Sequence, residues 1–497
     1  MRKEDQTGVA NGAYSTRWSA EVARCCGRPS VPAAALAMIL VCGAAPGICA
    51  GEAGGKGLVL KSSRVSGTID HVTVQIEAAG DRRGEIASLK SNAEKSEKKT
   101  PVEVACSLEF YEKLLDGVSG GQNVRRSLRH YASTRAEVKI GAEQERVELR
   151  DQRRYVVVES SPAITFFSPQ GPLTVEEFDL LKQIGDSALL DGLLPDEAVS
   201  AGTSWRPDGA LVAALFGLDE VSKHDITCRV TEITDAVVRF EIGGSAAGRV
   251  NDAAGSIEVR GKYRFDRRLQ RVDWMGVAAK VHCDISAVWA EFDLAIRAQT
   301  RVLPSESPPA FAEEKLAGMS LQRTDDALRI EHVSESKDWM LVHSRNWFAT
   351  NYHRDVATLR LVRDGEYVAF ASISLLPKRP ADQVPSLSEF QADVKKALGK
   401  SFEELEDAGQ SVNSSQIRVL RVVVKGRLEE SPRQWRYFHV TDPIGRQAVI
   451  AFNVEGKLAG KLDGEDSELV NGFRFLLPAK IEPGDSSSDG SPRQPER

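Results

Sequence analysis

The segment IGDSALL, residues 184–190, places a serine beside a glycine and an aspartate, a residue set from which a hydrolase could build a nucleophile. Such a serine needs a sharp strand-to-helix turn and a histidine base held by an aspartate. Ser187 instead follows a helix predicted within residues 171–190, and no histidine in the chain has an aspartate three residues before it. The segment therefore predicts the end of a helix at Gly185, and no catalytic serine.

Phosphate motifs are incomplete. In LGKS, residues 398–401, the first glycine of a P-loop would fall at position 394, which is Val394. The segment GGSAAGR, residues 243–249, lacks the lysine, and GEAGGKG, residues 51–57, lies next to a leader-like segment. None of the three segments is predicted to bind phosphate.

Metal motifs are also missing, since the chain has no H-E-x-x-H and no C-x-x-C after residue 50. His332, His343 and His353 are spread over strand and loop, and we predict surface or half-buried histidines there, with a metal site as the alternative. The sequence thus predicts no catalytic residue, no cofactor and no metal ligand.

The sequence leaves open whether two of the cysteines form a disulfide bond. In the predicted strands DITCRV and KVHCDI, Cys228 and Cys283 share a face with apolar neighbours, so both thiols point toward the core of one domain. They could pair in an oxidising compartment, or they could be two separate buried thiols, and the sequence favours neither.

Four aromatic residues cluster at the entry to the second half of the chain. We predict that most of them pack in the core or at a sheet edge, and that an exposed subset would form a patch for a partner. The four are Trp339, Trp347, Phe348 and Tyr352.

The N-terminus has the order of a secretory signal. Arg24 and Arg28 precede the apolar run VPAAALAMILVCGAAPGICA, and a polar, Gly-rich stretch follows. We predict export to the periplasm or the outside, with cleavage after Ala50. The alternative is an uncleaved anchor, which is the one form in which membrane association is expected.

Composition divides the rest of the chain. The net charge of −6 and pI near 5.9 argue against non-specific nucleic-acid binding. Length and a Pro/Ser/Glu-rich stretch predict two independently folding domains. The predicted division is a signal peptide (1–50), a short linker (51–57), a β-rich domain (58–303), a linker (304–325), a second domain (326–478) and a disordered tail (479–497).

The second domain is predicted to be an antiparallel sheet with packed helices. Its clearest element is a helix over 387–399, with a capping box at Ser386 and Glu389 and an apolar stripe through Phe390 and Val394. Hairpin signals flank it on both sides. With a mostly antiparallel β domain before it, a half-barrel or sandwich with a helix, the chain is predicted to be α+β.

The order WMLVHSRNWF, LVRDGEYVAFASISLL, LSEFQADVKKALG, RVVVKGRLEESPRQWRYFHV, DPIGRQAVIAFNV and DSELVNGFRF resembles the PsbP-like α/β sandwich family. That resemblance implies a non-enzymatic binding or assembly module. The first domain resembles, more weakly, the lipoprotein-carrier (LolA-like) half-barrels, which implies an apolar groove.

These resemblances lead to one functional prediction. We predict an exported, non-catalytic envelope protein that binds a protein partner or an apolar, lipid-like ligand and no nucleic acid. The alternative is a secreted hydrolase whose site residues meet only in the folded chain.

Overall fold

The structure is a computed structural model. It describes residues 57–84, 99–115, 125–160, 163–250, 253–353, 356–363, 365–380, 383–413 and 416–476. The predicted cleavage site at Ala50 and the whole of the predicted tail, 479–497, lie outside these residues. In the described part, no helix is long and apolar enough to cross a membrane.

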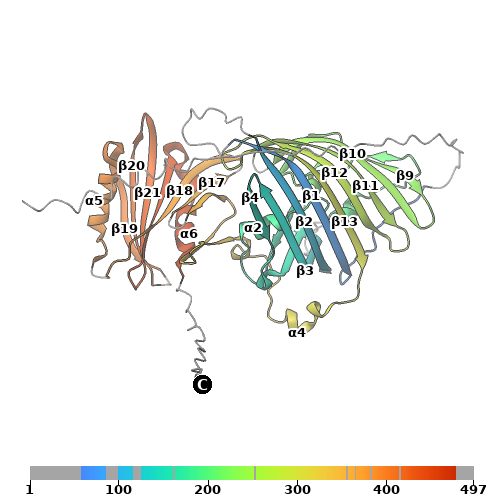
Figure 1. Cartoon of the computed structure of the whole chain (residues 1–497), viewed down its shortest axis with the longest axis horizontal. Coiled ribbons are helices and arrows are strands. Elements are labelled where there is room, and N and C mark those ends of the chain that lie inside the picture. Colours follow the sequence, from blue (N-terminus) through green and yellow to red (C-terminus); the bar gives the residue numbers. More distant parts are fainter. Residues whose placement is uncertain are drawn as a thin grey trace, which may run out of the picture.

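A 13-stranded antiparallel sheet forms the first domain (Figure 1). Its order is β6-β5-β3-β2-β1-β13-β12-β11-β10-β9-β7, with β4 paired to β3 and β8 to β10. The strands are β1 (Ile69–Arg83), β2 (Lys99–Leu115), β3 (Arg125–Ile140), β4 (Glu143–Val147), β5 (Tyr155–Ser160), β6 (Ile164–Phe167), β7 (Ser204–Trp205), β8 (Glu220–His224), β9 (Thr227–Ile233), β10 (Val237–Val250), β11 (Ala253–Asp266), β12 (Arg271–Cys283) and β13 (Glu291–Pro304).

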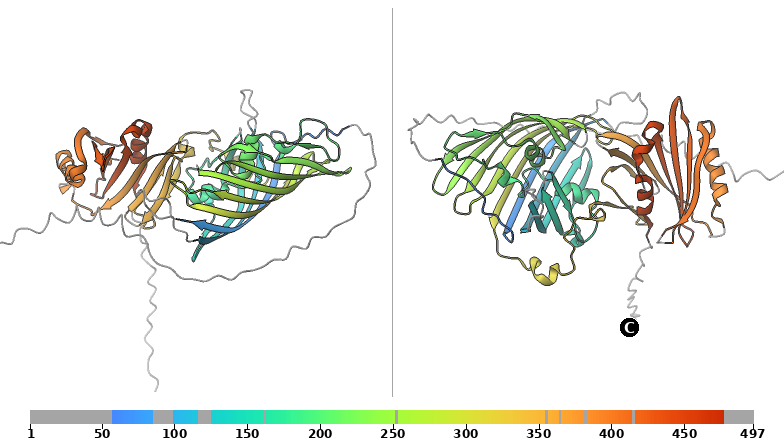
Figure 2. Two further views of the ribbon diagram at one scale, coloured as in Figure 1. Left: turned by 90° about the horizontal axis from the view of Figure 1, so that it is seen from above. Right: turned by 180° about the vertical axis from the view of Figure 1, so that it is seen from behind.

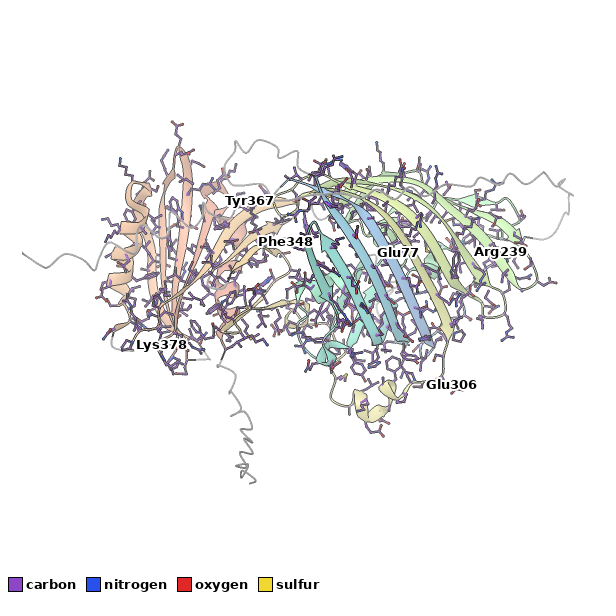
Figure 3. All side chains as sticks on the ribbon, viewed as in Figure 1. Glu77, Arg239, Glu306, Phe348, Tyr367 and Lys378 are labelled. Atoms are coloured by element: carbon purple, nitrogen blue, oxygen red, sulfur yellow. The ribbon has the colours of Figure 1, made fainter. Side chains whose placement is uncertain are left out.

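The sheet is curved, and the short helices of the first domain lie on one side of it (Figure 2). Those that contribute to the core on this side are α2 (Val175–Leu181), the 3-10 helix η3 (Leu190–Leu193) and α3 (Gly209–Phe216). We call the covered side the inner face and the other side the outer face. Because side chains alternate along a strand, each long strand has an apolar inner row and a polar outer row. Glu77 and Arg239, labelled in Figure 3, belong to outer rows.

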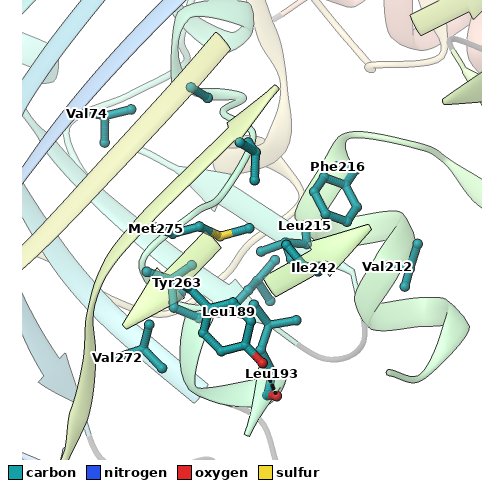
Figure 4. Packing of buried hydrophobic residues seen from close by; sticks show 14 of the residues in the cluster. Val74, Leu189, Leu193, Val212, Leu215, Phe216, Ile242, Tyr263, Val272 and Met275 are labelled. Atoms are coloured by element: carbon teal, nitrogen blue, oxygen red, sulfur yellow. Dashed lines mark hydrogen bonds between the residues drawn. The ribbon is translucent and has the colours of Figure 1, made fainter. Parts of the chain in front are cut away.

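The inner face holds the core of the first domain. Tyr263 and Met275, both 1% exposed, pack with leucines of the helical segment such as Leu189 and Leu193 (Figure 4). The hydroxyl of Tyr263 also donates to the carbonyl of Leu193 at 3.2 Å. The segment from α2 to α3 therefore covers the inner face with the chain's own apolar side chains.

A seven-stranded antiparallel sheet forms most of the second domain, in the order β16-β17-β18-β22-β21-β20-β19. Its strands are β16 (Trp347–His353), β17 (Val356–Arg363), β18 (Glu366–Leu376), β19 (Phe402–Val412), β20 (Arg418–Leu428), β21 (Ser431–Thr441) and β22 (Gln447–Glu455). A small sheet, β14-β15-β23, stands beside it: β14 (Ile330–Val333), β15 (Trp339–His343) and β23 (Phe473–Phe475).

Helix α5 (Leu387–Leu398) begins at the predicted capping box, with Ser386 and Glu389 each bonded to the other's backbone. Phe390 and Val394 are 5% and 3% exposed and pack against apolar residues of β20 and β21. The 3-10 helix η8 (Gly456–Leu462) and α6 (Glu465–Gly472) contribute to a separate core cluster that also includes β17, β18 and β22. The predicted helix and the strand it packs against are thus both present.

The predicted α+β class is wrong. The described chain is mostly β, with three antiparallel sheets and few helices. The helix predicted within 171–190 is only the seven-residue α2, and α5 has 12 residues, whereas β2 alone has 17. Strong capping signals mark where a helix begins, but they do not make it long enough to form a layer.

The two domains touch in the structure. The carbonyl of Leu173 accepts from the backbone N–H of Glu331 at 2.8 Å, and the Glu331 carboxylate pairs with Arg150. Arg345 of the second domain donates to the carbonyl of Phe166 at 2.8 Å. The segment predicted as a linker, 304–325, contains α4 (Glu313–Leu316) and packs Phe311, 5% exposed, against the first domain. Independent folding of the two domains stays a prediction.

Candidate functional site

A hollow of about 900 Å³ lies on the outer face of the large sheet. It crosses six neighbouring strands, from β9 through β10, β11, β12 and β13 to β1. Nine of the seventeen lining residues are polar or charged, and these nine stand on exposed outer rows. This hollow is the candidate binding site.

Small residues on β12 make the floor of the hollow. Ala278 lies between Arg260 of β11 and Arg297 of β13 in the strand register. Gly276, two residues earlier on the same row, lies between Lys262 and Gln299. The floor is therefore low along β12 while longer side chains flank it on both sides.

Trp274 closes one end of the floor. A Cβ atom on Gly276 would stand 2.8 Å from the Cζ2 and Cη2 atoms of the Trp274 ring, so the indole lies over the glycine. Trp274 is half-buried and stands on the same outer row as Gly276, Ala278 and Lys280. Any side chain at position 276 would collide with the indole in this position, so the glycine is required for it. The indole gives the hollow an aromatic surface at one end.

Basic side chains outnumber acidic ones in the hollow. Lys262 approaches Glu241 at 3.7 Å, and Glu77 is the register partner of Arg297. The hollow contains three arginines, Arg229, Arg260 and Arg297. Over the residues that the structure describes, their guanidinium groups form no hydrogen bond or ion pair. The lining holds four cations (Arg229, Arg260, Lys262, Arg297) against two anions (Glu77, Glu241), a surplus of two positive charges.

Ser187 is part of a buried ionic network, and it has no histidine among its hydrogen-bond partners. Its hydroxyl donates to Glu112 at 2.9 Å. Arg129, 0% exposed, donates to Glu112 at 2.8 Å and to Asp186 at 2.9 Å. Arg64 donates to the other Glu112 oxygen at 2.8 Å. Through these contacts the segment IGDSALL ties the inner helices to the sheet.

The network holds its central carboxylate ionised. Burial alone would raise the pKa of Glu112, but the charges of Arg129 and Arg64 more than offset burial and lower this pKa to about 2. The pKa of Glu112 is lower in the folded chain than in the unfolded chain, so the network stabilises the fold at a pH above the unfolded pKa. This stabilisation is lost as the pH falls through the folded pKa of about 2. Further members of the network are Asp70, Ser127, Asp191 and Arg271.

Cys228 and Cys283 both lie buried on the inner face, as the alternation of their strands predicts, and both are free thiols. Strands β10 and β11 separate β9 from β12. Three strand spacings amount to about 14 Å, far beyond the separation that a disulfide spans. The structure therefore holds two separate buried thiols and no Cys228–Cys283 bond.

The aromatic cluster divides between core and partial exposure. Trp339 is 1% exposed and Trp347 is 3% exposed, and the indole of Trp347 donates to Glu465 at 2.9 Å. Phe348 is half-buried, and the side chain of Tyr352 is outside the described part. Burial of both tryptophans removes them from any exposed partner patch.

Two of the three histidines of the second domain, His332 and His343, have described side chains. Burial and the neighbouring His343 lower the pKa of His332 to about 4, and the Nδ1 atom of His343 is 2.8 Å from the carbonyl oxygen of Ser344. The side chain of His353 is outside the described part. Among the described residues, no group of three or more His, Cys, Asp or Glu is placed to hold a metal ion.

Comparisons with known proteins give likenesses of fold at low identity. No protein-family model matches the chain, and no curated protein matches it. Cyanobacterial PsbP (CyanoP) from Synechocystis sp. PCC 6803 matches 30% of this chain and 94% of its own, with 10% identity and a TM-score of 0.25. The Ran-binding protein Mog1p of Saccharomyces cerevisiae matches 30% and 95%, with 11% identity and a TM-score of 0.23.

Lipovitellin matches 49% of this chain and 26% of its own chain, at 7% identity and a TM-score of 0.27. At these scores the likenesses carry no argument about function. The PsbP-like resemblance predicted from the sequence has structural matches over 30% of the chain. The resemblance to lipoprotein carriers stays a prediction.

Sequence reasoning missed the hollow. Its signal was present in β12, where the polar row reads Trp274, Gly276, Ala278, Lys280 and so carries two small residues where long polar ones are usual. The flanking arginines come from strands whose register the sequence does not state. The sequence therefore showed the two small residues of β12, but it did not show the flanking arginines that make the hollow a candidate site.

Proposed function

We propose that the chain is a non-catalytic binding protein that holds a polar, anionic ligand in the outer hollow of its large sheet. The observation that carries this proposal is the set of unpaired arginines around the small-residue floor of β12. Guanidinium groups form strong, geometrically specific pairs with carboxylates and phosphates. If the chain is exported, as its first fifty residues predict, the ligand is met outside the cytoplasm.

An apolar ligand has less support. The inner face, where a half-barrel would hold a lipid-like molecule, is covered by α2, η3 and α3 and their buried side chains. The Ser187 hydroxyl gives no support to a hydrolytic function, because it is engaged by Glu112 inside the ionic network. Binding at the polar outer hollow therefore has the most support.

The test is the affinity of the full chain for short poly-L-glutamate, a polyanion without rings, measured by calorimetry at low salt. We expect the double variant Arg260→Ala, Arg297→Ala to bind at least about tenfold more weakly, because two charge-assisted pairs are lost. The salt dependence of the remaining binding should also be shallower.

The matched control is the double variant Arg135→Ala, Arg146→Ala. These two exposed arginines belong to the same sheet, pair with Glu137 and Glu148, and lie outside the lining of the hollow. Their loss should change the affinity by less than about twofold, since exposed pairs contribute little. Equal losses for the two double variants, or no binding by the parent chain, would contradict the proposal.

A further inference from the structure

We infer that the anionic ligand is an acidic carbohydrate, a chain of sugar rings that carry carboxylates. This inference rests on the proposed function and adds the chemical class of the ligand. It is drawn from three features that occur together in the hollow: an aromatic ring at the end of the floor, unpaired arginines along the walls, and carboxylates and amides beside them.

The aromatic ring of Trp274 favours a ligand with a flat, weakly polar face. The indole of Trp274 lies over Gly276 at the level of the strand, and it is the one aromatic residue in the lining. The C–H face of a sugar ring packs on such a surface, because its polarised hydrogens meet the negative face of the π system. A flexible acidic peptide without rings would leave this surface uncovered.

The other polar side chains call for a ligand that donates hydrogen bonds. Glu77 and Glu241 are acceptors only, while Gln75 and Gln299, register partners of each other, both donate and accept. Sugar hydroxyls can donate to the two carboxylates. The phosphodiester backbone of DNA has no hydroxyl groups to donate to these carboxylates, so it fits the lining less well.

The shape of the hollow calls for an extended ligand. It runs across six strands on an open face, and neighbouring strands are about 4.8 Å apart. Arg260 and Arg297 stand on opposite sides of the Ala278 floor. A carboxylated chain lying across this floor can therefore place successive carboxylates beside different arginines.

The experiment compares two probes with equal numbers of carboxylates, oligogalacturonate and poly-L-glutamate, on the full chain. We expect the parent chain to bind oligogalacturonate about 2- to 10-fold more tightly, the order of gain from one aromatic contact. Trp274→Leu should abolish this preference and keep the poly-L-glutamate affinity. Trp274→Phe, which retains a ring, should keep most of the preference.

A second variant leaves Trp274 in the chain. Gly276→Val puts a side chain where the indole lies, so it should displace the ring and remove the preference as Trp274→Leu does. Thermal melts of each variant verify that the chain is folded. Uncharged oligosaccharide should bind at least about tenfold more weakly than oligogalacturonate, because it cannot pair with the arginines.

The outcomes separate the two proposals. The carbohydrate inference is overturned by equal affinity for both probes or by a preference that survives Trp274→Leu. It is also overturned if uncharged oligosaccharide binds as tightly as oligogalacturonate, or if single-stranded DNA, titrated in the same way, binds more tightly. Arginine-dependent binding of poly-L-glutamate in the same titrations would leave the proposed function standing. If the chain binds neither oligogalacturonate nor poly-L-glutamate, both the carbohydrate inference and the proposed function are overturned.

Discussion

Replacing Arg129 by methionine is expected to lower the free energy of unfolding by about 3–5 kcal/mol, the usual cost of removing one partner from a buried ion pair. Methionine roughly keeps the length of the side chain, but it leaves Asp186 without a guanidinium and Glu112 with that of Arg64 alone. Both carboxylates are at most 1% exposed, so water cannot replace the lost donors without opening the structure. Calorimetric melts of the full chain measure the loss.

The control for this prediction is Arg135→Met, on the same strand. Arg135 is exposed and pairs only with Glu137, so its loss should cost less than about 1 kcal/mol. A compensating change adds a second check: Asp186→Asn in the Arg129→Met background removes one stranded charge and should recover part of the stability. If Arg129→Met were no more destabilising than Arg135→Met, the network would not join the inner helices to the sheet.

Phe390→Ala is expected to destabilise the second domain by about 3–5 kcal/mol, which is the loss of buried area plus the cavity left behind. Phe390 packs from α5 onto the sheet with Leu420 and Val422. The ring also lies 5.5 Å from that of His439. Denaturant melts of the chain record the change.

Gln391→Ala, one residue further along α5, is the matched control. Gln391 is not among the buried residues of this cluster, and its truncation should change the stability by no more than about 0.5 kcal/mol. Similar small losses for both variants would mean that α5 is a solvated connector. The contacts of Phe390 with the sheet would then have no energetic role.

Local features of the second domain could be predicted because their signals are local. The capping box at Ser386 and Glu389 fixed the start of α5, and the turn signal DPIG fixed the hairpin of β21 and β22, where Gly445 has a φ of 84°. Each signal depends on residues within a few positions of one another. The overall class was wrong because such signals do not report how much of the chain is strand.

The hollow and the ionic network could not be predicted, because both depend on pairings between distant parts of the chain. Strand β1 pairs with β13, and the register that brings Glu77 opposite Arg297 joins residues more than two hundred positions apart. Arg64, Glu112 and Asp186 likewise come from three separate segments. Alternation predicted which face each residue occupies, and only the register determined its neighbours.

The central claim is that the outer hollow binds an anionic ligand through its arginines. Its most direct test is arginine footprinting of the full chain with phenylglyoxal, read by mass spectrometry with and without poly-L-glutamate. We predict that the ligand protects Arg260 and Arg297 from modification and leaves Arg135 and Arg146 as reactive as before. Equal protection of all four arginines, or protection of none of them, would contradict the account.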